Sequence, residues 1–235
     1  MSEASCSKHI IKLSNIQRLI GERMLESKLN KPCFYVESKA NVTELMGMRG
    51  KLRKKFGVKI TTNAFYIRSL GAAVQKYPLM VGVLEGENIK IAERINVGFA
   101  VNTPPGLVVP VVKDADKKSL AEIAREEKLL TEKARSNKLT LEEVEGETIA
   151  LSNLGVYGID SFIGIVPPPV STILAVGNVI REAVPEDEKI AIQKRVSLCL
   201  AVDHRIINGS YAAEFLRYIV EQLEKPGQLS LNKEK

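Results

Sequence analysis

The sequence has few of the residues that bind metals or form disulfides. Its 235 residues include three cysteines, Cys6, Cys33 and Cys199, and two histidines, His9 and His204. An odd number of scattered cysteines favours free thiols in a reducing compartment over a disulfide framework. No CxxC pair or Cys/His cluster occurs, so the sequence predicts no metal site.

The chain also lacks an apolar run that is suited to a membrane-spanning helix. Two uncharged runs, Ile95–Val112 and Ser161–Ile180, approach the required length. Both contain clustered prolines, such as Pro167-Pro168-Pro169, which would leave backbone groups unpaired in lipid. The N-terminus has no apolar stretch of the secretory type. We therefore expect no membrane partner and a cytoplasmic location.

Charge alone says little about partners. The formal net charge is +6, from 34 basic and 28 acidic residues, and the densest basic stretch runs from Arg49 to Lys59. No nucleic-acid-binding motif surrounds this stretch, so we interpret it as a solvated helix face. Contact with an anionic ligand or with nucleic acid stays open as an alternative.

Apolar periodicity and capping signals predict alternating helices and strands within one domain. The expected helices cover Asn15–Lys28, Thr43 to about Gly57, Asn63–Lys76, a segment that starts at the capping box Ser119-Leu-Ala-Glu122, and a segment that carries Phe215, Leu216, Ile219, Val220 and Leu223. The expected strands are Asn88–Ala92, Ile95–Val101, Leu107–Val112, Thr148–Ser152, Ser171–Val179 and Arg195–Val202. Because helices interrupt the strands, the class is α/β or α+β with a mixed sheet. Runs without alternation, such as Leu107–Val112, favour strands that are covered on both faces.

His204 is the histidine with a suggestive setting. It follows the apolar strand Arg195–Val202 and precedes a helix, which would place it at a sheet edge facing a cleft. His9 lies in the unpatterned N-terminal arm, where we expect an exposed residue. On position alone, His204 is either structural or catalytic.

The motif around His204 resolves that choice by resemblance. The run Asp203-His204-Arg205-Ile-Ile-Asn208-Gly209 resembles the signature of the catalytic domain of dihydrolipoamide acyltransferases from 2-oxo acid dehydrogenase complexes. The resemblance covers about Ile11 to Pro226. Four further fragments match in the same order: Arg18–Ser27, Asn96–Val112, Leu139–Gly155 and Ile173–Gly177.

The resemblance implies an α/β, chloramphenicol acetyltransferase-like fold, with a mixed sheet and flanking helices, and a specific chemistry. His204 would be the general base that takes the proton of the coenzyme A thiol, and Ser152 the hydroxyl that stabilises the oxyanion. Asn208 stands where many members have Asp, which implies an orienting role. The acyl group would move between a dihydrolipoyl thioester and coenzyme A.

The family's usual chain also carries lipoyl and peripheral-subunit-binding domains, and neither is recognisable here. The domain division is an N-terminal arm (1–10), the catalytic domain (11–226) and a C-terminal tail (227–235), with the lipoyl group supplied by a separate domain or protein. The resemblance further implies a homotrimer with active sites between subunits, assembly into an octahedral or icosahedral cage, and dehydrogenase components as partners.

Three other functions compete with this one. A free acyltransferase for small alcohols or amines would share the base and the fold. A non-catalytic cage scaffold would have lost the chemistry, with Asn208 as its only support. A nucleic-acid module rests on charge alone and is the weakest. The sequence identifies neither the acyl group nor the residues that contact coenzyme A.

Overall fold

The computed structural model describes residues 11–104, 106–186 and 189–230. Its helices are α1 (Asn15–Asn30), α2 (Thr43–Phe56), α3 (Thr62–Lys76), α4 (Leu120–Arg135), α5 (Gly209–Glu224) and α6 (Gly227–Ser230), with 3-10 turns η1 (Pro78–Val81) and η2 (Gly155–Tyr157). Its strands are β1 (Cys33–Asn41), β2 (Gly82–Glu85), β3 (Asn88–Ile91), β4 (Val97–Phe99), β5 (Val101–Thr103), β6 (Gly106–Val108), β7 (Val111–Val112), β8 (Ile149–Asn153), β9 (Thr172–Glu186) and β10 (Lys189–Asp203). The predicted arm, residues 1–10, lies outside the described residues.

The main sheet has six strands in the order β1-β10-β9-β8-β4-β7. Strand β8 runs parallel to both β4 and β9, whereas β10 is antiparallel to its neighbours β1 and β9, and β4 pairs antiparallel with β7. The ribbons β2-β3 and β5-β6 form separate two-stranded sheets. The predicted mixed sheet with flanking helices is confirmed.

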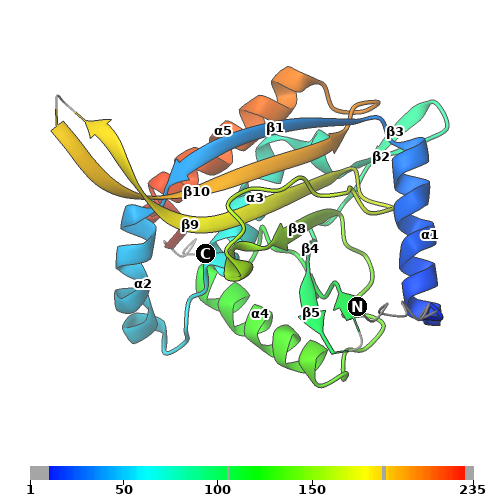
Figure 1. Cartoon of the computed structure of the whole chain (residues 1–235), viewed down its shortest axis with the longest axis horizontal. Coiled ribbons are helices and arrows are strands. Elements are labelled where there is room, and N and C mark those ends of the chain that lie inside the picture. Colours follow the sequence, from blue (N-terminus) through cyan, green and yellow to red (C-terminus); the bar gives the residue numbers. More distant parts are fainter. Residues whose placement is uncertain (1–10, 105, 187–188, 231–235) are drawn as a thin grey trace, which may run out of the picture.

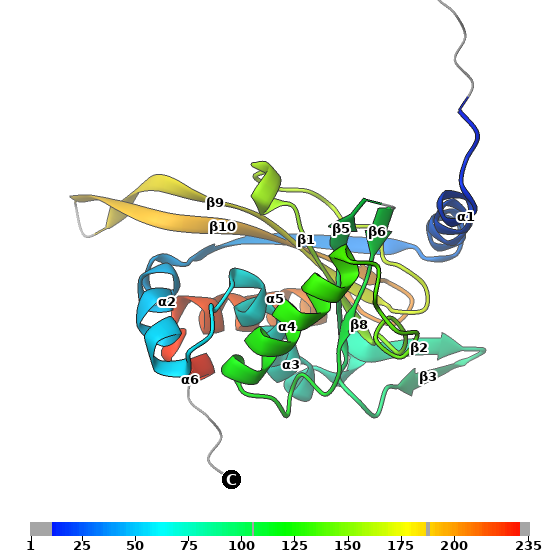
Figure 2. The same cartoon turned by 90° about the horizontal axis from the view of Figure 1, so that it is seen from below.

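Helices α2, α3, α4 and α5 lie on one side of this sheet, while α1 stands at its end (Figures 1 and 2). Val196, Leu198, Leu200 and Val202 of β10 point to the helical side and join the main apolar core. The opposite face has only a small buried cluster, formed by Ala150, Val166, Val170, Ile173 and Ala201. Burial is therefore unequal on the two faces, and the face without helices is the one left for other contacts.

Capping explains where the helices begin and end. Capping boxes start α1 at Ser14 and α4 at Ser119, as predicted, because each serine and the side chain three residues later satisfy free backbone N–H groups reciprocally. Helix α2 ends at Gly57, whose φ of +66° is the left-handed conformation that glycine adopts without a side-chain clash. The apolar stripe of α4, formed by Leu120, Ile123, Leu130 and Ala134, is buried.

Several strands differ from the prediction. Strand β1 was not predicted. Its less exposed positions include Phe34, Val36, Ser38 and Ala40, and the polar Ser38 interrupts the apolar alternation that would indicate a half-buried strand. Strands β9 and β10 extend beyond the core as a long hairpin, seen at the left of Figure 1, where charged residues follow the apolar segments. The predicted strands Ile95–Val101 and Leu107–Val112 are each replaced by two short strands, β4 with β5 and β6 with β7. Leu107 is 52% exposed rather than covered.

The first four residues of the predicted C-terminal tail are helical. Helix α6 begins directly after Pro226, and its Leu229 is buried in the main core. Residues 231–235 lie outside the described part. Among the helices that the structure describes, none is long and apolar enough to cross a membrane.

Candidate active site

His204 lies in the tight turn between β10 and α5. Its backbone N–H donates to the carbonyl of Pro32 at 2.9 Å, and its ring packs on Phe34 with centroids 4.9 Å apart. Gly209 also lies against Phe34, since a Cβ there would approach the ring to 3.1 Å. The side chain of His204 is exposed, as a base that must meet a substrate requires. The predicted place at a strand end before a helix is confirmed.

Asp203 holds this turn in shape. Its carboxylate, 1% exposed, accepts from Arg205 Nε at 2.9 Å and Nη2 at 2.6 Å, and its carbonyl oxygen accepts from the N–H groups of Ile206 and Ile207. The hydrogen bonds from Arg205 to Asp203 raise the pKa of the Arg205 guanidinium. Asp203 and Arg205 therefore pair with each other, and Asp203 also accepts from the backbone, which fixes the turn that carries His204.

Asn208 is the N-cap of α5. Its Oδ1 accepts from the backbone N–H of Tyr211 and from the hydroxyl of Ser210, both at 2.9 Å. Asparagine caps a helix about as well as aspartate, so the uncharged side chain costs the helix little. Within the ranges described, the Nδ2 of Asn208 makes no hydrogen bond, and one amide donor on the His204 loop stays available.

Ser152 lies in β8, near its carboxyl end. Its half-buried side chain shares a face with Ala150 and therefore points to the side of the sheet without helices. Its hydroxyl has no hydrogen-bond partner among the residues that the structure describes. A free, half-buried hydroxyl beside an apolar cluster is suited to donate to a substrate oxygen.

The turn after Ser152 is held by close backbone packing. Asn153 Oδ1 accepts from the N–H of Gly155 at 2.9 Å. A Cβ at Gly155 would collide with the backbone carbonyl of Gly177 in β9, and one at Gly177 would collide with the carbonyl of Asp160. Glycines are therefore required where these segments cross, and the crossing fixes the Ser152 turn against β9.

One chain does not bring Ser152 and His204 together. Ser152 is aligned with Ala175, which is aligned with Cys199, five residues before His204. With about 3.3 Å per residue and about 4.8 Å per strand, the two residues are about 19 Å apart. No hydrogen-bond chain or single substrate thioester spans that distance within the sheet plane.

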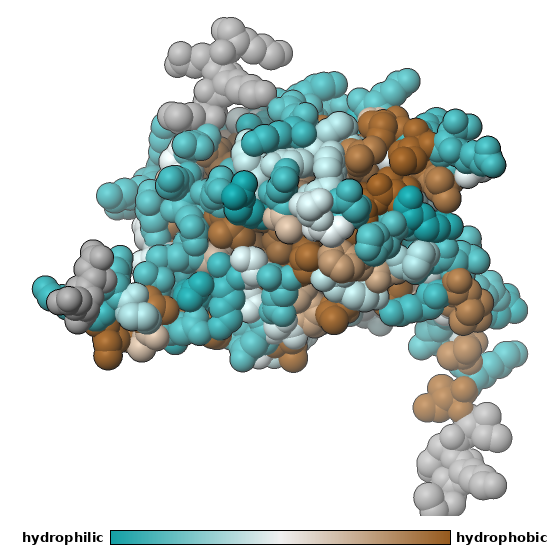
Figure 3. Space-filling view, turned by 90° about the horizontal axis from the view of Figure 1, so that it is seen from above, coloured by the Kyte–Doolittle hydropathy of each residue, from teal (hydrophilic) through white to brown (hydrophobic). Residues whose placement is uncertain are grey.

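The surface beyond Ser152 is apolar and exposed. Val156 is 83% exposed, Tyr157 59% and Ile163 61%, and all three follow the Ser152 turn. Further apolar side chains, including Ile89 and Ile91, gather over the β2-β3 ribbon (Figure 3). Exposed apolar patches of this kind mark contact surfaces.

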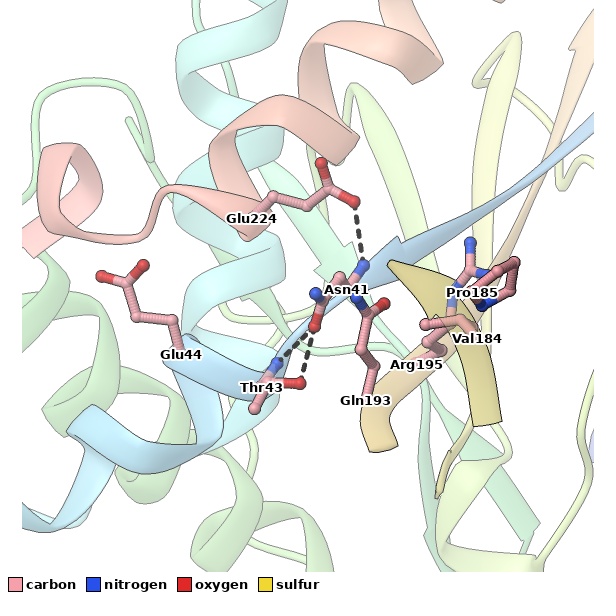
Figure 4. Close-up of a pocket in the computed structure, with 8 residues that line it drawn as sticks. All are labelled: Asn41, Thr43, Glu44, Val184, Pro185, Gln193, Arg195 and Glu224. Carbon is pink, nitrogen blue, oxygen red and sulfur yellow. Dashed lines mark hydrogen bonds between the residues drawn. The ribbon is translucent and has the colours of Figure 1, made fainter. Parts of the chain in front are cut away.

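Figure 4 shows a pocket in another part of the molecule, at the base of the β9-β10 hairpin. Glu224 accepts there from the backbone N–H of Asn41, whose side chain accepts from Thr43. The pocket contains none of the three predicted catalytic residues. Among the described residues, no three carboxylate, thiol or imidazole side chains gather as a metal site would require.

Comparison with known proteins identifies the family. The family model of the 2-oxoacid dehydrogenases acyltransferase (catalytic domain) matches residues 6–231. The chain belongs to this acyltransferase family. It is 36% identical over 217 residues to the dihydrolipoyllysine-residue acetyltransferase component of the pyruvate dehydrogenase complex of Rickettsia prowazekii, in a match that covers 91% of this chain. The same match covers 53% of that relative, so the chain spans about half its length.

Solved structures agree with the family. The cubic core of a pyruvate dehydrogenase multienzyme complex has a TM-score of 0.90 and 29% identity, with 98% of each chain covered. The dihydrolipoamide acetyltransferase of Azotobacter vinelandii gives 0.90 and 29%, over 95% of this chain and 94% of the other. A chloramphenicol acetyltransferase, 14% identical with a TM-score of 0.52, shares the fold over 92% of this acyltransferase and 98% of its own chain. The predicted fold is confirmed.

The Azotobacter vinelandii structure concerns the role of a serine, a histidine and an asparagine in that enzyme's catalytic mechanism. There the serine precedes the histidine by 52 residues and the asparagine follows it by four. Ser152, His204 and Asn208 have the same separations in this chain.

The structure adds residues that sequence reasoning missed. Asn153 contacts Asn63 of α3, and Asn63 contacts Glu127 of α4. Glu127 occupies a position on the buried stripe of α4, between Ile123 and Leu130. A charged residue at an apolar position was the signal that could have revealed it.

Proposed function

We propose that this acyltransferase moves an acyl group between the thioester of a dihydrolipoyl arm and coenzyme A. The observation that carries the proposal is the match of Ser152, His204 and Asn208, in identity and separation, to the three residues of the Azotobacter vinelandii enzyme. Family membership and the exposed setting of His204 support it.

His204 acts first in the direction of acyl-CoA formation. A thiol is mostly protonated at neutral pH, so a neutral imidazole must take the proton as the coenzyme A sulfur attacks the thioester carbonyl. The new carbon–sulfur bond pushes an electron pair onto the carbonyl oxygen. Ser152 donates a hydrogen bond to that oxygen, and one such donor is typically worth about 3 kcal/mol.

Collapse of the tetrahedral intermediate completes the transfer. The bond to the dihydrolipoyl sulfur breaks, and the imidazolium of His204 returns its proton to that sulfur. The products are acyl-CoA and a dihydrolipoyl dithiol, so atoms and charge balance without an acyl-enzyme. Asn208 and the Asp203–Arg205 pair hold the loop of His204 throughout.

We further propose that each site forms between two copies of the chain in a trimer. The separation of about 19 Å between Ser152 and His204 supports this, because only a neighbouring subunit could bring the two residues together. The apolar surface that follows Ser152 supplies a contact face. Assembly of trimers into a cage, a lipoyl group on a separate domain or protein, and dehydrogenase components as partners belong to the same proposal.

Acyl transfer between acyl-CoA and free dihydrolipoamide tests the function. Acetyl-, succinyl- and isobutyryl-CoA are compared, with His204→Ala as the matched variant. We expect turnover that falls by about 10²–10⁴-fold in the variant, the usual contribution of a general base. The preferred donor identifies the acyl group.

Two results would contradict the proposal. A folded protein with no turnover on any donor would favour the scaffold function. Transfer to small alcohols or amines, without transfer to dihydrolipoamide, would favour the free acyltransferase.

A further inference from the structure

A chain of hydrogen bonds leads from the Ser152 turn into the protein interior. Asn153, the residue after Ser152, donates from Nδ2 to Asn63 Oδ1 at 2.7 Å. The other end of the Asn153 amide, Oδ1, accepts from Gly155 N. Asn63 lies in the first turn of α3, which packs against both β8 and α4 (Figure 2).

The chain ends at a buried carboxylate. Glu127 of α4 is 6% exposed, accepts from Thr61 Oγ1 at 2.6 Å and is hydrogen-bonded by the side chain of Asn63. Burial raises the pKa of Glu127, and these two hydrogen bonds oppose the rise because they stabilise the charged form. The Thr61 hydroxyl also accepts from Ala64 N and so caps α3.

The carboxylate sets the direction of every bond in the chain. Glu127 accepts from Thr61, and Asn63 Oδ1 accepts from Asn153, so the NH₂ group of Asn63 is the end that faces Glu127. Asn153 must then donate to Asn63, which leaves its own oxygen for Gly155. The side-chain amides of Asn63 and Asn153, whose oxygen and nitrogen could otherwise be exchanged, therefore each have one permitted orientation.

We propose that Asn63, oriented by Glu127, is a positioning residue that holds the Ser152 hydroxyl where the oxyanion develops. Asn63 touches no substrate and acts through Asn153, whose backbone is continuous with Ser152. An oxyanion donor works only at the correct distance, and a displacement of about 1 Å costs about a hundredfold in rate. The proposal rests on the proposed role of Ser152 in acyl transfer.

A double-mutant cycle tests it. Asn63→Ala and Ser152→Ala are made singly and together, and kcat and KM for acyl transfer are measured for each. We expect Asn63→Ala alone to lower kcat by about ten- to a hundredfold, with KM within about twofold. In the Ser152→Ala background the same substitution should lower kcat by less than about twofold, because the group that it positions is gone.

Asn96→Ala is the matched control. Asn96 is a buried asparagine whose side chain makes two hydrogen bonds, from Nδ2 to the Gly146 carbonyl and to Oδ1 from Asp114 N, and neither bond involves Asn153. Any effect that it has on kcat should be the same in both backgrounds. Glu127→Gln provides a second variant of equal size, which keeps the packing and removes the obligatory acceptor. It should lower kcat by about three- to tenfold.

The outcomes distinguish the positioning role of Asn63 from the role of Ser152 on which it rests. A kcat loss in Asn63→Ala that is equal with and without the Ser152 hydroxyl would overturn the positioning role. So would wild-type kcat in a folded Asn63→Ala protein, or, if that variant does not fold, wild-type kcat in Glu127→Gln. Wild-type kcat in Ser152→Ala would instead refute the role of Ser152 itself, and with it the premise.

Discussion

Mixing subunits that lack Ser152 with subunits that lack His204 should restore acyl transfer. The expectation follows from the register of the sheet, which places the two residues about 19 Å apart in one chain. If each site takes His204 from one subunit and Ser152 from its neighbour, a mixed ring contains intact sites, although no single chain is intact.

The size of the recovery follows from counting interfaces. In a random equal mixture, an interface is intact when a His204-bearing chain precedes a Ser152-bearing chain, which happens in about one interface in four. The unselected mixture should therefore reach about a quarter of wild-type turnover, and trimers that contain both variants, with one intact interface in three, about a third. The single variants should be lower by about 10²-fold or more, since each lacks a base or an oxyanion donor.

The assay uses co-expression. Ser152→Ala and His204→Ala chains with different affinity tags are produced together, and assemblies that carry both tags are purified and assayed for acetyl transfer. Each variant produced alone, and a mixture of the two preformed variants, serve as controls. Turnover of verified mixed assemblies that stays at the level of the single variants would refute the shared site.

Three further outcomes are expected. Burial raises the pKa of Glu147 to about 7, so the folded state holds this proton more tightly than the unfolded state, and stability should fall by up to about 3 kcal/mol as pH rises from about 5 through 7. Glu147→Gln cannot titrate, so its unfolding free energy should gain on that of the wild type as pH rises. A difference that stays constant with pH would contradict this. Gly177→Ala should destabilise by about 2–3 kcal/mol and lower kcat, because its Cβ must displace the carbonyl of Asp160 beside the Ser152 turn, and denaturant unfolding with kinetics checks both effects. Ser119→Ala should cost about 1 kcal/mol of unfolding free energy through the loss of its cap on Glu122 N, with kcat unchanged, and a change in kcat would show that α4 transmits more than stability.

Local signals in the sequence predicted much of the secondary structure and the place of His204. Helix starts at Ser14 and Ser119 were predictable because a capping box involves residues three apart, whose contacts form in any context. The place of His204 between a strand and a helix was predictable for the same reason. Its motif, together with Ser152, indicated the family before any geometry was available.

Tertiary structure decided what depends on residues far apart in the chain. The separation of Ser152 from His204 follows from the strand order β10-β9-β8, which no local pattern encodes. The contact between Asn153 and Asn63 joins residues 90 positions apart, and that between Thr61 and Glu127 joins residues 66 apart. Such contacts exist only after distant elements pack, because chain entropy opposes them until burial of the core offsets its cost. The proposed catalytic residues could therefore be found in the sequence, whereas the contacts that support them and the distance between them were set by the packed fold.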